Sequence, residues 1–114
     1  MRYGILFAAV AVSSGFSSAY AHAHLRASIP ADGSVLQSAP AQLVMQLSEP
    51  AKLTALSIQR GSEKPRPLSA PEQAATQIRI GLPALTSGKY LVHWRALSED
   101  GHVTSGTLHF TLQP

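Results

Sequence analysis

Apolar and polar residues alternate along most of the chain beyond residue 22. Because side chains leave a β-strand on alternate faces, this pattern predicts strands with one buried face. Weaker alternation predicts further strands at Leu25 to Ser28, Leu43 to Ser48 and Leu53 to Gln59. No segment keeps a helical period. The alternation is clearest in three segments, with apolar residues at Ile78, Ile80 and Leu82, at Tyr90, Val92, Trp94 and Ala96, and at Leu108, Phe110 and Leu112.

Turn-forming residues separate the predicted strands. Pro30-Ala31-Asp32-Gly33 and Thr86-Ser87-Gly88 have the composition of turns, and the proline-containing stretch from Gly61 to Gln73 is the longest predicted loop. About seven short strands joined in this way predict an all-β fold, a single antiparallel Greek-key β-sandwich.

The first 21 residues have the composition of a secretory signal peptide. Arg2 supplies a positive charge, Gly4 to Val12 is apolar, and Ala19-Tyr20-Ala21 is a small-x-small cleavage site. The apolar run is shorter than the roughly 20 residues that a membrane helix needs. We therefore expect residues 1–21 to be removed, residues 22–114 to form one domain in the periplasm, and no membrane insertion of the mature chain. The second A-x-A pattern, Ala21-His22-Ala23, leaves cleavage two residues later open.

The composition argues against several functional classes. Cysteine is absent, so the chain has no disulfide, thiolate metal site, thiol nucleophile or lipid-anchoring cysteine. Without Arg2, the predicted mature chain has eight Lys or Arg and six Asp or Glu, a formal charge of +2 with no basic run. Nucleic acid is therefore not expected as a partner. The 93 mature residues are few for a fold with a large enclosed cleft, and we do not expect an enzyme.

Donor atoms for a metal occur at two places in the sequence. Cleavage after Ala21 would expose the α-amine of His22, and this amine and Nδ1 of the same residue can close a six-membered chelate ring. Asp100 and His102 stand at a predicted strand-to-strand corner, where Gly101 allows the two side chains to converge. If both places meet at one end of the sandwich, three nitrogens and one carboxylate oxygen would hold one Cu(II) per chain. Zn(II) would accept similar ligands.

The remaining histidines have other expected roles. A histidine at the third mature position allows a square-planar Cu(II) or Ni(II) chelate through deprotonated backbone amides, and His24 meets that requirement. A strand commits those amides to hydrogen bonds, so we favour the first site, with His24 beside it. His93 and His109 alternate with core positions and are expected on the solvent side, whereas Tyr90 and Trp94 are expected in the core.

Three segments of the sequence together form a recognisable pattern: His22-Ala23-His24-Leu25 with Ser28-x-Pro30-Ala31-Asp32-Gly33; Leu47-Ser48-Glu49-Pro50; and Gly88-x-Tyr90-x-Val92-x-Trp94-x-x-x-Ser98-x-Asp100-Gly101-His102-x-x-x-Gly106-x-x-x-Phe110. In these segments the chain resembles the CopC family of periplasmic copper-resistance proteins. The resemblance implies a cupredoxin-like or Ig-like sandwich that binds Cu(II) through His22, Asp100 and His102. Glu49 would be an additional ligand, or it would accept a hydrogen bond from the terminal amine, which is the role we favour. The methionine-rich loop of some members is absent, so a Cu(II) site without a separate Cu(I) site is expected.

The sequence thus predicts a periplasmic protein that sequesters or carries Cu(II) for copper resistance or homeostasis. An inner-membrane copper importer or another periplasmic copper protein would receive the ion. Two alternatives stay open. One is a copper-dependent oxidative enzyme of the lytic polysaccharide monooxygenase type, for which the chain is small and lacks a run of exposed aromatic residues. The other is a metal-free Ig-like interaction module in which the histidines are incidental.

Overall fold

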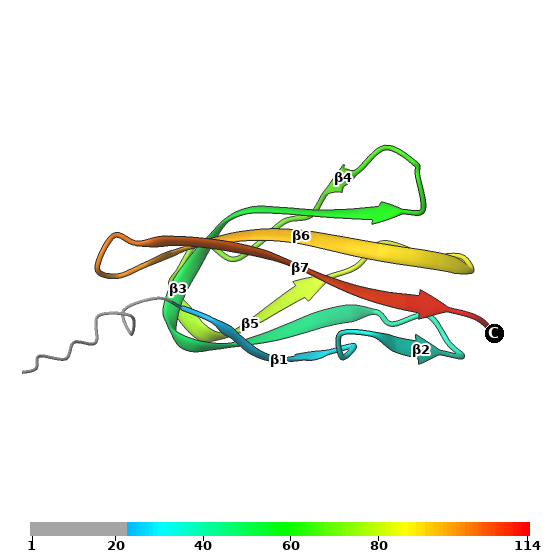
Figure 1. Ribbon diagram of the computed structural model, residues 1–114, viewed down its shortest axis with the longest axis horizontal. Helices are drawn as coiled ribbons and strands as arrows, with labels where there is room; N and C mark the ends of the chain where they lie inside the picture. The colour runs from blue at the N-terminus through cyan, green and yellow to red at the C-terminus, as the bar shows by residue number, and fades with distance from the viewer. Residues whose placement is uncertain (1–22) are drawn as a thin grey trace, which may run out of the picture.

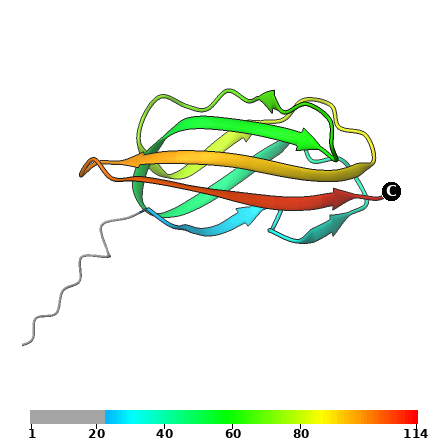
Figure 2. The ribbon, with the colours of Figure 1, turned by 45° about the horizontal axis from the view of Figure 1, so that its top comes forward.

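The computed structural model describes residues 23–114. This part of the chain forms seven strands. No helix in this part is long and apolar enough to cross a membrane. The strands lie in two layers (Figures 1 and 2), as the predicted all-β sandwich requires. In chain order they are β1 (Leu25–Ile29), β2 (Ser34–Leu36), β3 (Gln42–Arg60), β4 (Arg66–Pro67), β5 (Ala75–Gly81), β6 (Gly88–Ser98) and β7 (Val103–Leu112).

Strand β3 belongs to both layers. Its first half pairs with β1 and β5, and its second half pairs with β4 and β6, so the chain bends from one layer into the other (Figure 1). The prediction of two separate strands in this region was wrong. Pro50 has no N–H to donate, but it lies where the ladder with β5 shifts register between Gln46 and Ala51. The strand therefore continues through the proline without losing a required hydrogen bond.

The other predicted strands are confirmed by β1, β5, β6 and β7. Two short strands had no pattern to predict them: β2 has three residues, and β4 lies inside the predicted long loop. Strand β2 pairs in parallel with β7, which is an exception to the antiparallel pairing of the other strands. The turn at Asp32-Gly33 forms as expected, and Gly33 has a φ of +84°, which favours glycine.

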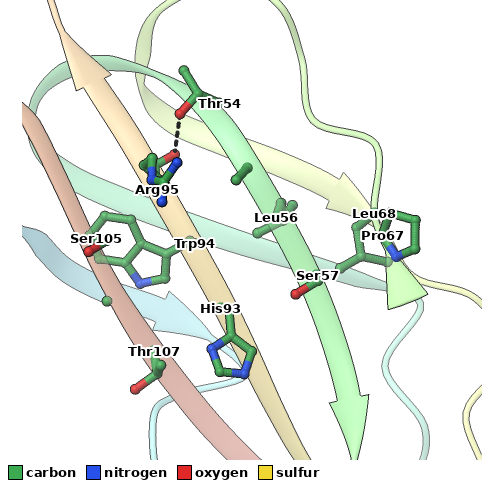
Figure 3. Close-up of a pocket in the computed structure, with 12 residues that line it drawn as sticks. Thr54, Leu56, Ser57, Pro67, Leu68, His93, Trp94, Arg95, Ser105 and Thr107 are labelled. Carbon is green, nitrogen blue, oxygen red and sulfur yellow. Dashed lines mark hydrogen bonds between the residues drawn. The ribbon is translucent and has the colours of Figure 1, made fainter. Parts of the chain in front are cut away.

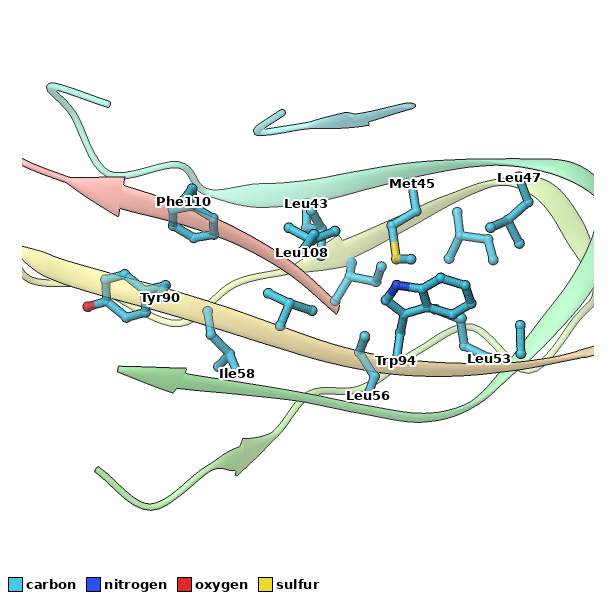
Figure 4. Close-up of a cluster of buried hydrophobic side chains, with 14 of the residues drawn as sticks. Leu43, Met45, Leu47, Leu53, Leu56, Ile58, Tyr90, Trp94, Leu108 and Phe110 are labelled. Atoms are coloured by element: carbon cyan, nitrogen blue, oxygen red, sulfur yellow. The ribbon is translucent and has the colours of Figure 1, made fainter. Parts of the chain in front are cut away.

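The core lies between the two layers and is formed by the alternating apolar residues (Figure 4). Leu43 and Met45 of β3 are fully buried there. Tyr90 and Trp94 of β6 are also buried, and the Tyr90 ring stacks on Phe110 of β7 with ring centroids 5.4 Å apart. These residues confirm that the even-numbered positions of β6 and β7 face inward.

Candidate metal centre

The candidate site lies at the tight hairpin that joins β6 to β7. The backbone N–H of Ser98 donates to the carbonyl oxygen of His102 at 2.9 Å, and the N–H of Gly101 donates to the carbonyl oxygen of Ser98 at 3.0 Å. Gly101 has a φ of +91°, a conformation that other residues resist. The short turn brings the side chains before and after the glycine onto one side.

Asp100 and His102 contact each other in this hairpin. The Oδ2 atom of Asp100 is 3.0 Å from Nδ1 of His102. The other carboxylate oxygen, Oδ1, accepts hydrogen bonds from the hydroxyl of Ser98 at 2.5 Å and from the backbone N–H of His102 at 3.2 Å. The side chains of Asp100 and His102 are 40% and 52% exposed, so solvent reaches the pair. One oxygen thus fixes the carboxylate while the other faces the imidazole.

These contacts lower the pKa of the Asp100 carboxyl from its ordinary 3.8 to about 2. The hydroxyl of Ser98 is the largest cause, followed by the backbone N–H of His102, and the imidazole of His102 adds a smaller effect. Hydrogen bonds to a carboxylate favour its ionised form. Asp100 therefore keeps its negative charge to a lower pH than an ordinary aspartate, and this charge suits a divalent cation.

The start of the described chain lies beside this hairpin. The carbonyl oxygen of Ala23 accepts a hydrogen bond from the hydroxyl of Thr104 at 2.9 Å, and Thr104 follows His102 by two positions. Ala23 is almost completely buried, with 1% of its surface exposed. Figures 1 and 2 show β1 starting at the same end of the sandwich as the β6–β7 hairpin. His22 precedes Ala23 directly but lies outside the described residues.

His24 is anchored to β3 through its backbone. Its N–H donates to the hydroxyl of Ser48 at 2.8 Å, and its carbonyl oxygen accepts from the N–H of Ser48 at the same distance. The His24 side chain is exposed. Glu49 follows Ser48 and is half-buried at the bend of β3. Because Ala51 pairs with Ser98, this bend lies next to the β6–β7 hairpin.

Within residues 23–114, no group of three or more histidine, aspartate or glutamate side chains is arranged to hold a metal ion. The structure therefore brings Asp100 and His102 together but does not add His24 or Glu49 to them as a ready ligand cluster. His93 and His109 lie on the solvent side of β6 and β7, as predicted. Neither belongs to the candidate site.

Sequence reasoning missed the residues that hold the site in place. Ser98 orients Asp100, while Thr104 and Ser48 secure the backbone of the first described residues. Hydroxyl residues are common in strands and give no periodic signal. The one usable signal is the position of Ser98 two residues before Asp100, which places both on one face of an extended chain.

Comparison with known proteins shows to which family this chain belongs. Residues 25–113 match the family model of the CopC domain. The chain belongs to the CopC family. Copper resistance protein C of Escherichia coli is 33% identical over 109 residues, which cover 84% of this chain and 85% of that protein. Copper resistance protein C of Xanthomonas campestris pv. juglandis is 32% identical over 117 residues, which cover 91% of this chain and 90% of that protein.

Solved structures agree with this membership of the CopC family. The crystal structure of CopC from Methylosinus trichosporium OB3b superposes with a TM-score of 0.75 at 25% identity, covering 82% of this chain and 95% of that one. PcoC, described as a methionine-rich copper resistance protein from Escherichia coli, gives a TM-score of 0.64 at 30% identity, with coverage of 82% and 100%. The present CopC-family chain has only two methionines. One of them, Met45, is buried in the core.

Proposed function

We propose that this CopC-family protein binds one Cu(II) ion per chain in the periplasm and carries or sequesters it for copper resistance. The proposed ligands are the α-amine and imidazole of His22, the carboxylate of Asp100 and the imidazole of His102. The observation that carries the proposal is the bond from Thr104 to Ala23, which ties the chain next to His22 to the strand that follows the Asp100–His102 pair. The names of the E. coli and Xanthomonas relatives support copper as the ion.

The proposal requires removal of residues 1–21. Cleavage after Ala21 would make His22 the first residue and convert its peptide nitrogen into a basic amine. Ala23 is buried in the fold, so cleavage after it would leave the chain without the residue that Thr104 holds. This contact favours cleavage after Ala21 over cleavage after Ala23.

The donor set suits Cu(II). Three nitrogens and one ionised carboxylate oxygen match the preference of Cu(II) for nitrogen and oxygen in tetragonal geometry. Asp100 is ionised at neutral pH, so no proton has to leave this group when the ion binds. Cu(I) prefers softer sulfur donors, and Met45 is enclosed in the core. The site is therefore expected to hold Cu(II) for transfer and not to cycle between oxidation states.

The backbone of His24 supports this site over the square-planar alternative. In that alternative the amide of His24 must lose its proton and bind the metal. Here the same N–H donates to Ser48, and the carbonyl of His24 accepts from Ser48, so the alternative would break the connection to β3. For Glu49 we propose the role of a hydrogen-bond acceptor for the terminal amine, because it lies at the bend next to the hairpin.

The decisive experiment compares two forms of the protein, one starting at His22 and one with a single extra residue before it. The extension keeps every side chain but turns the α-amine into an amide. Cu(II) affinity is measured by competition with a chelator. It should fall by more than the roughly 10–100-fold that is typical when a group hydrogen-bonded to a metal ligand is lost. The melting temperature of the metal-free protein should be the same in both forms. Equal affinity with an unchanged ligand-field spectrum would contradict the proposal.

His24→Ala is the matched control for the competing chelate. Our site predicts affinity within about threefold of the wild type, because His24 is not a ligand and its backbone bonds to Ser48 persist. The square-planar chelate predicts that the same substitution abolishes tight binding. Intact mass of the exported protein, measured on the same sample, fixes the residue at which it begins.

A further inference from the structure

A second, unassigned feature is the solvent-facing side of the sheet formed by β3, β6 and β7. The inward residues of β6 in this region, Val92, Trp94 and Ala96, are buried, so the intervening His93 and Arg95 face outward. Cross-strand pairing builds two rows on this face. They are Ser57, His93 and Thr107, and Ala55, Arg95 and Ser105.

These rows line a groove with a volume of about 650 Å³ (Figure 3). Pro67 of β4 pairs with Ser57 and adds apolar surface beside it, and the adjacent Leu68, which packs against the core, completes the lining. Pro67 is held there because β4 pairs with the second half of β3. A volume of this size is within the range of sites for small organic ligands.

The groove is positively charged and rich in hydrogen-bond donors. Its lining contains no carboxylate, one guanidinium (Arg95), one imidazole (His93) and four hydroxyl groups. Arg95 forms no ion pair within residues 23–114, in contrast to Arg60, which contacts Glu63 at 2.6 Å. The hydroxyl groups belong to Thr54, Ser57, Ser105 and Thr107.

Two contacts orient the polar lining. The hydroxyl of Thr54 lies 3.5 Å from the carbonyl oxygen of Arg95 (Figure 3). A ring nitrogen of His93 lies 3.4 Å from Oε1 of Gln59, which stands further along β3. The guanidinium of Arg95 has no such contact in the described chain and is exposed. It is therefore the group that can reorient toward a ligand.

We propose that this groove binds a small organic anion that has a carboxylate and an apolar body. Arg95 would pair with the carboxylate, since a guanidinium presents two parallel N–H groups that match its two oxygens. Hydroxyl groups of Ser105 and Thr107 would supply further donors. The apolar body would cover Ala55 and Pro67. Because the lining contains no carboxylate, it would not repel an anionic ligand. For the same reason, it has no negative charge that could pair with an organic cation.

The proposal is independent of copper. The groove lies on the sheet face, whereas Asp100 and His102 lie in the hairpin at its end, and the two sets of residues do not overlap. Failure of one proposal therefore leaves the other intact.

The test is a titration of the exported, metal-free protein with benzoate, followed by amide NMR. Benzoate should produce saturable shifts confined to residues 54–57, 93–95 and 105–107. Benzylamine, which has a similar ring and the opposite charge, should produce no saturable shifts. Scattered, non-saturating shifts with benzoate, or equal binding of benzylamine, would overturn the proposal.

Arg95→Gln should weaken benzoate binding by about tenfold, because it removes the charge and keeps most of the side-chain length. Arg79→Gln is the matched control, since Arg79 is an exposed arginine on β5 that lies outside the groove. Unchanged affinity after Arg95→Gln would overturn the role of the guanidinium. Inorganic phosphate is the comparison probe, and tighter binding of phosphate than of benzoate would overturn the assignment to an organic carboxylate.

Discussion

Residues 23–114 contain two aspartate–histidine pairs with nearly the same geometry and different surroundings. In the hairpin, Oδ2 of Asp100 is 3.0 Å from Nδ1 of His102. Near the β2 edge of the same sheet, Oδ1 of Asp32 is 2.9 Å from Nδ1 of His109. A distance between the two side chains therefore does not distinguish a candidate metal site from an ordinary structural contact.

The difference lies in what else each carboxylate does. Oδ1 of Asp32 also accepts the backbone N–H of His109 at 2.8 Å, and the N–H of Gly33 donates to the His109 carbonyl oxygen at 2.6 Å. This pair fastens the β1–β2 connection to β7. In the hairpin, by contrast, Ser98 holds one oxygen of Asp100, and the other oxygen faces the imidazole of His102 beside the start of the chain. Under the proposed function, access to the amine and imidazole of His22 distinguishes the two pairs.

Replacing each histidine in turn is the strongest test of the difference between the two pairs. His102→Ala should lower Cu(II) affinity by more than about 100-fold, because it removes a proposed ligand. His109→Ala should change the affinity by less than about threefold, because His109 is distant from the hairpin. Chelator competition measures both. Similar losses in the two variants would mean that copper uses both pairs and that the hairpin pair is not the specific site.

Acid should act on the metal complex before it acts on the fold. Amine and imidazole donors have reference pKa values of about 7.7–8.0 and about 6.5, and they must lose protons to bind. We expect Cu(II) affinity to fall by about 100-fold or more between pH 7 and pH 5. Binding that stays constant over this range, measured by the same chelator competition, would argue against nitrogen ligands.

The metal-free protein supplies the control for this pH series. Asp100 has a lowered pKa, so its contribution to stability is fully present above the unfolded value of 3.8 and is lost as the pH falls through about 2. Between pH 7 and pH 5 this carboxylate stays ionised. Thermal unfolding of the apo protein over that interval should therefore show no loss that comes from Asp100.

Ser98→Ala tests whether the fixed carboxylate matters. The substitution removes the largest cause of the low Asp100 pKa, so this pKa should rise from about 2 toward 3.8. Cu(II) affinity should fall by about 10–100-fold, as is typical when a group that orients a ligand is lost. Carboxyl NMR and chelator competition measure the two effects. Ser105→Ala is the control on β7, and an equal effect there would show that Ser98 has no special role.

The smallest expected effect is at the second pair. Asp32→Ala removes the acceptor for both N–H groups of His109 and should cost about 1 kcal/mol of unfolding free energy, since the contact is largely exposed. That corresponds to a melting temperature lower by about 4–8 °C. Cu(II) affinity should not change. Glu63→Ala, which removes an exposed contact to Arg60, should have a smaller effect on melting.

Alternation of apolar residues was sufficient to predict β5, β6 and β7, because each has one buried face. It was not sufficient for β3, whose change of layer at Pro50 looks like a strand end in the sequence. The pairing of β2 with β7 joins residues far apart in the chain, and a strand of three residues has too few positions for a pattern. The local pattern of apolar and polar residues therefore predicts neither long-range pairing nor very short strands.

The same limit applies to side-chain contacts, which could be predicted between residues close in sequence but not between distant ones. Asp100 and His102 are close in sequence, so their convergence around Gly101 could be predicted from local backbone geometry, and the structure confirms it. Asp32 and His109 are 77 positions apart, and their contact could not be predicted locally. The part of His22 in metal binding stays a prediction, because that residue lies outside the described chain.

The double membership of β3 has a consequence for unfolding. Neither layer can lose β3 without taking away the central pairing partner of the other, since β1 and β5 depend on its first half and β4 and β6 on its second. The two layers should therefore unfold together in a single cooperative transition. In native-state hydrogen exchange, amides of Met45 in one layer and Ile58 in the other should open with the same free energy, and Cu(II) bound beside the bend should slow both by the same factor.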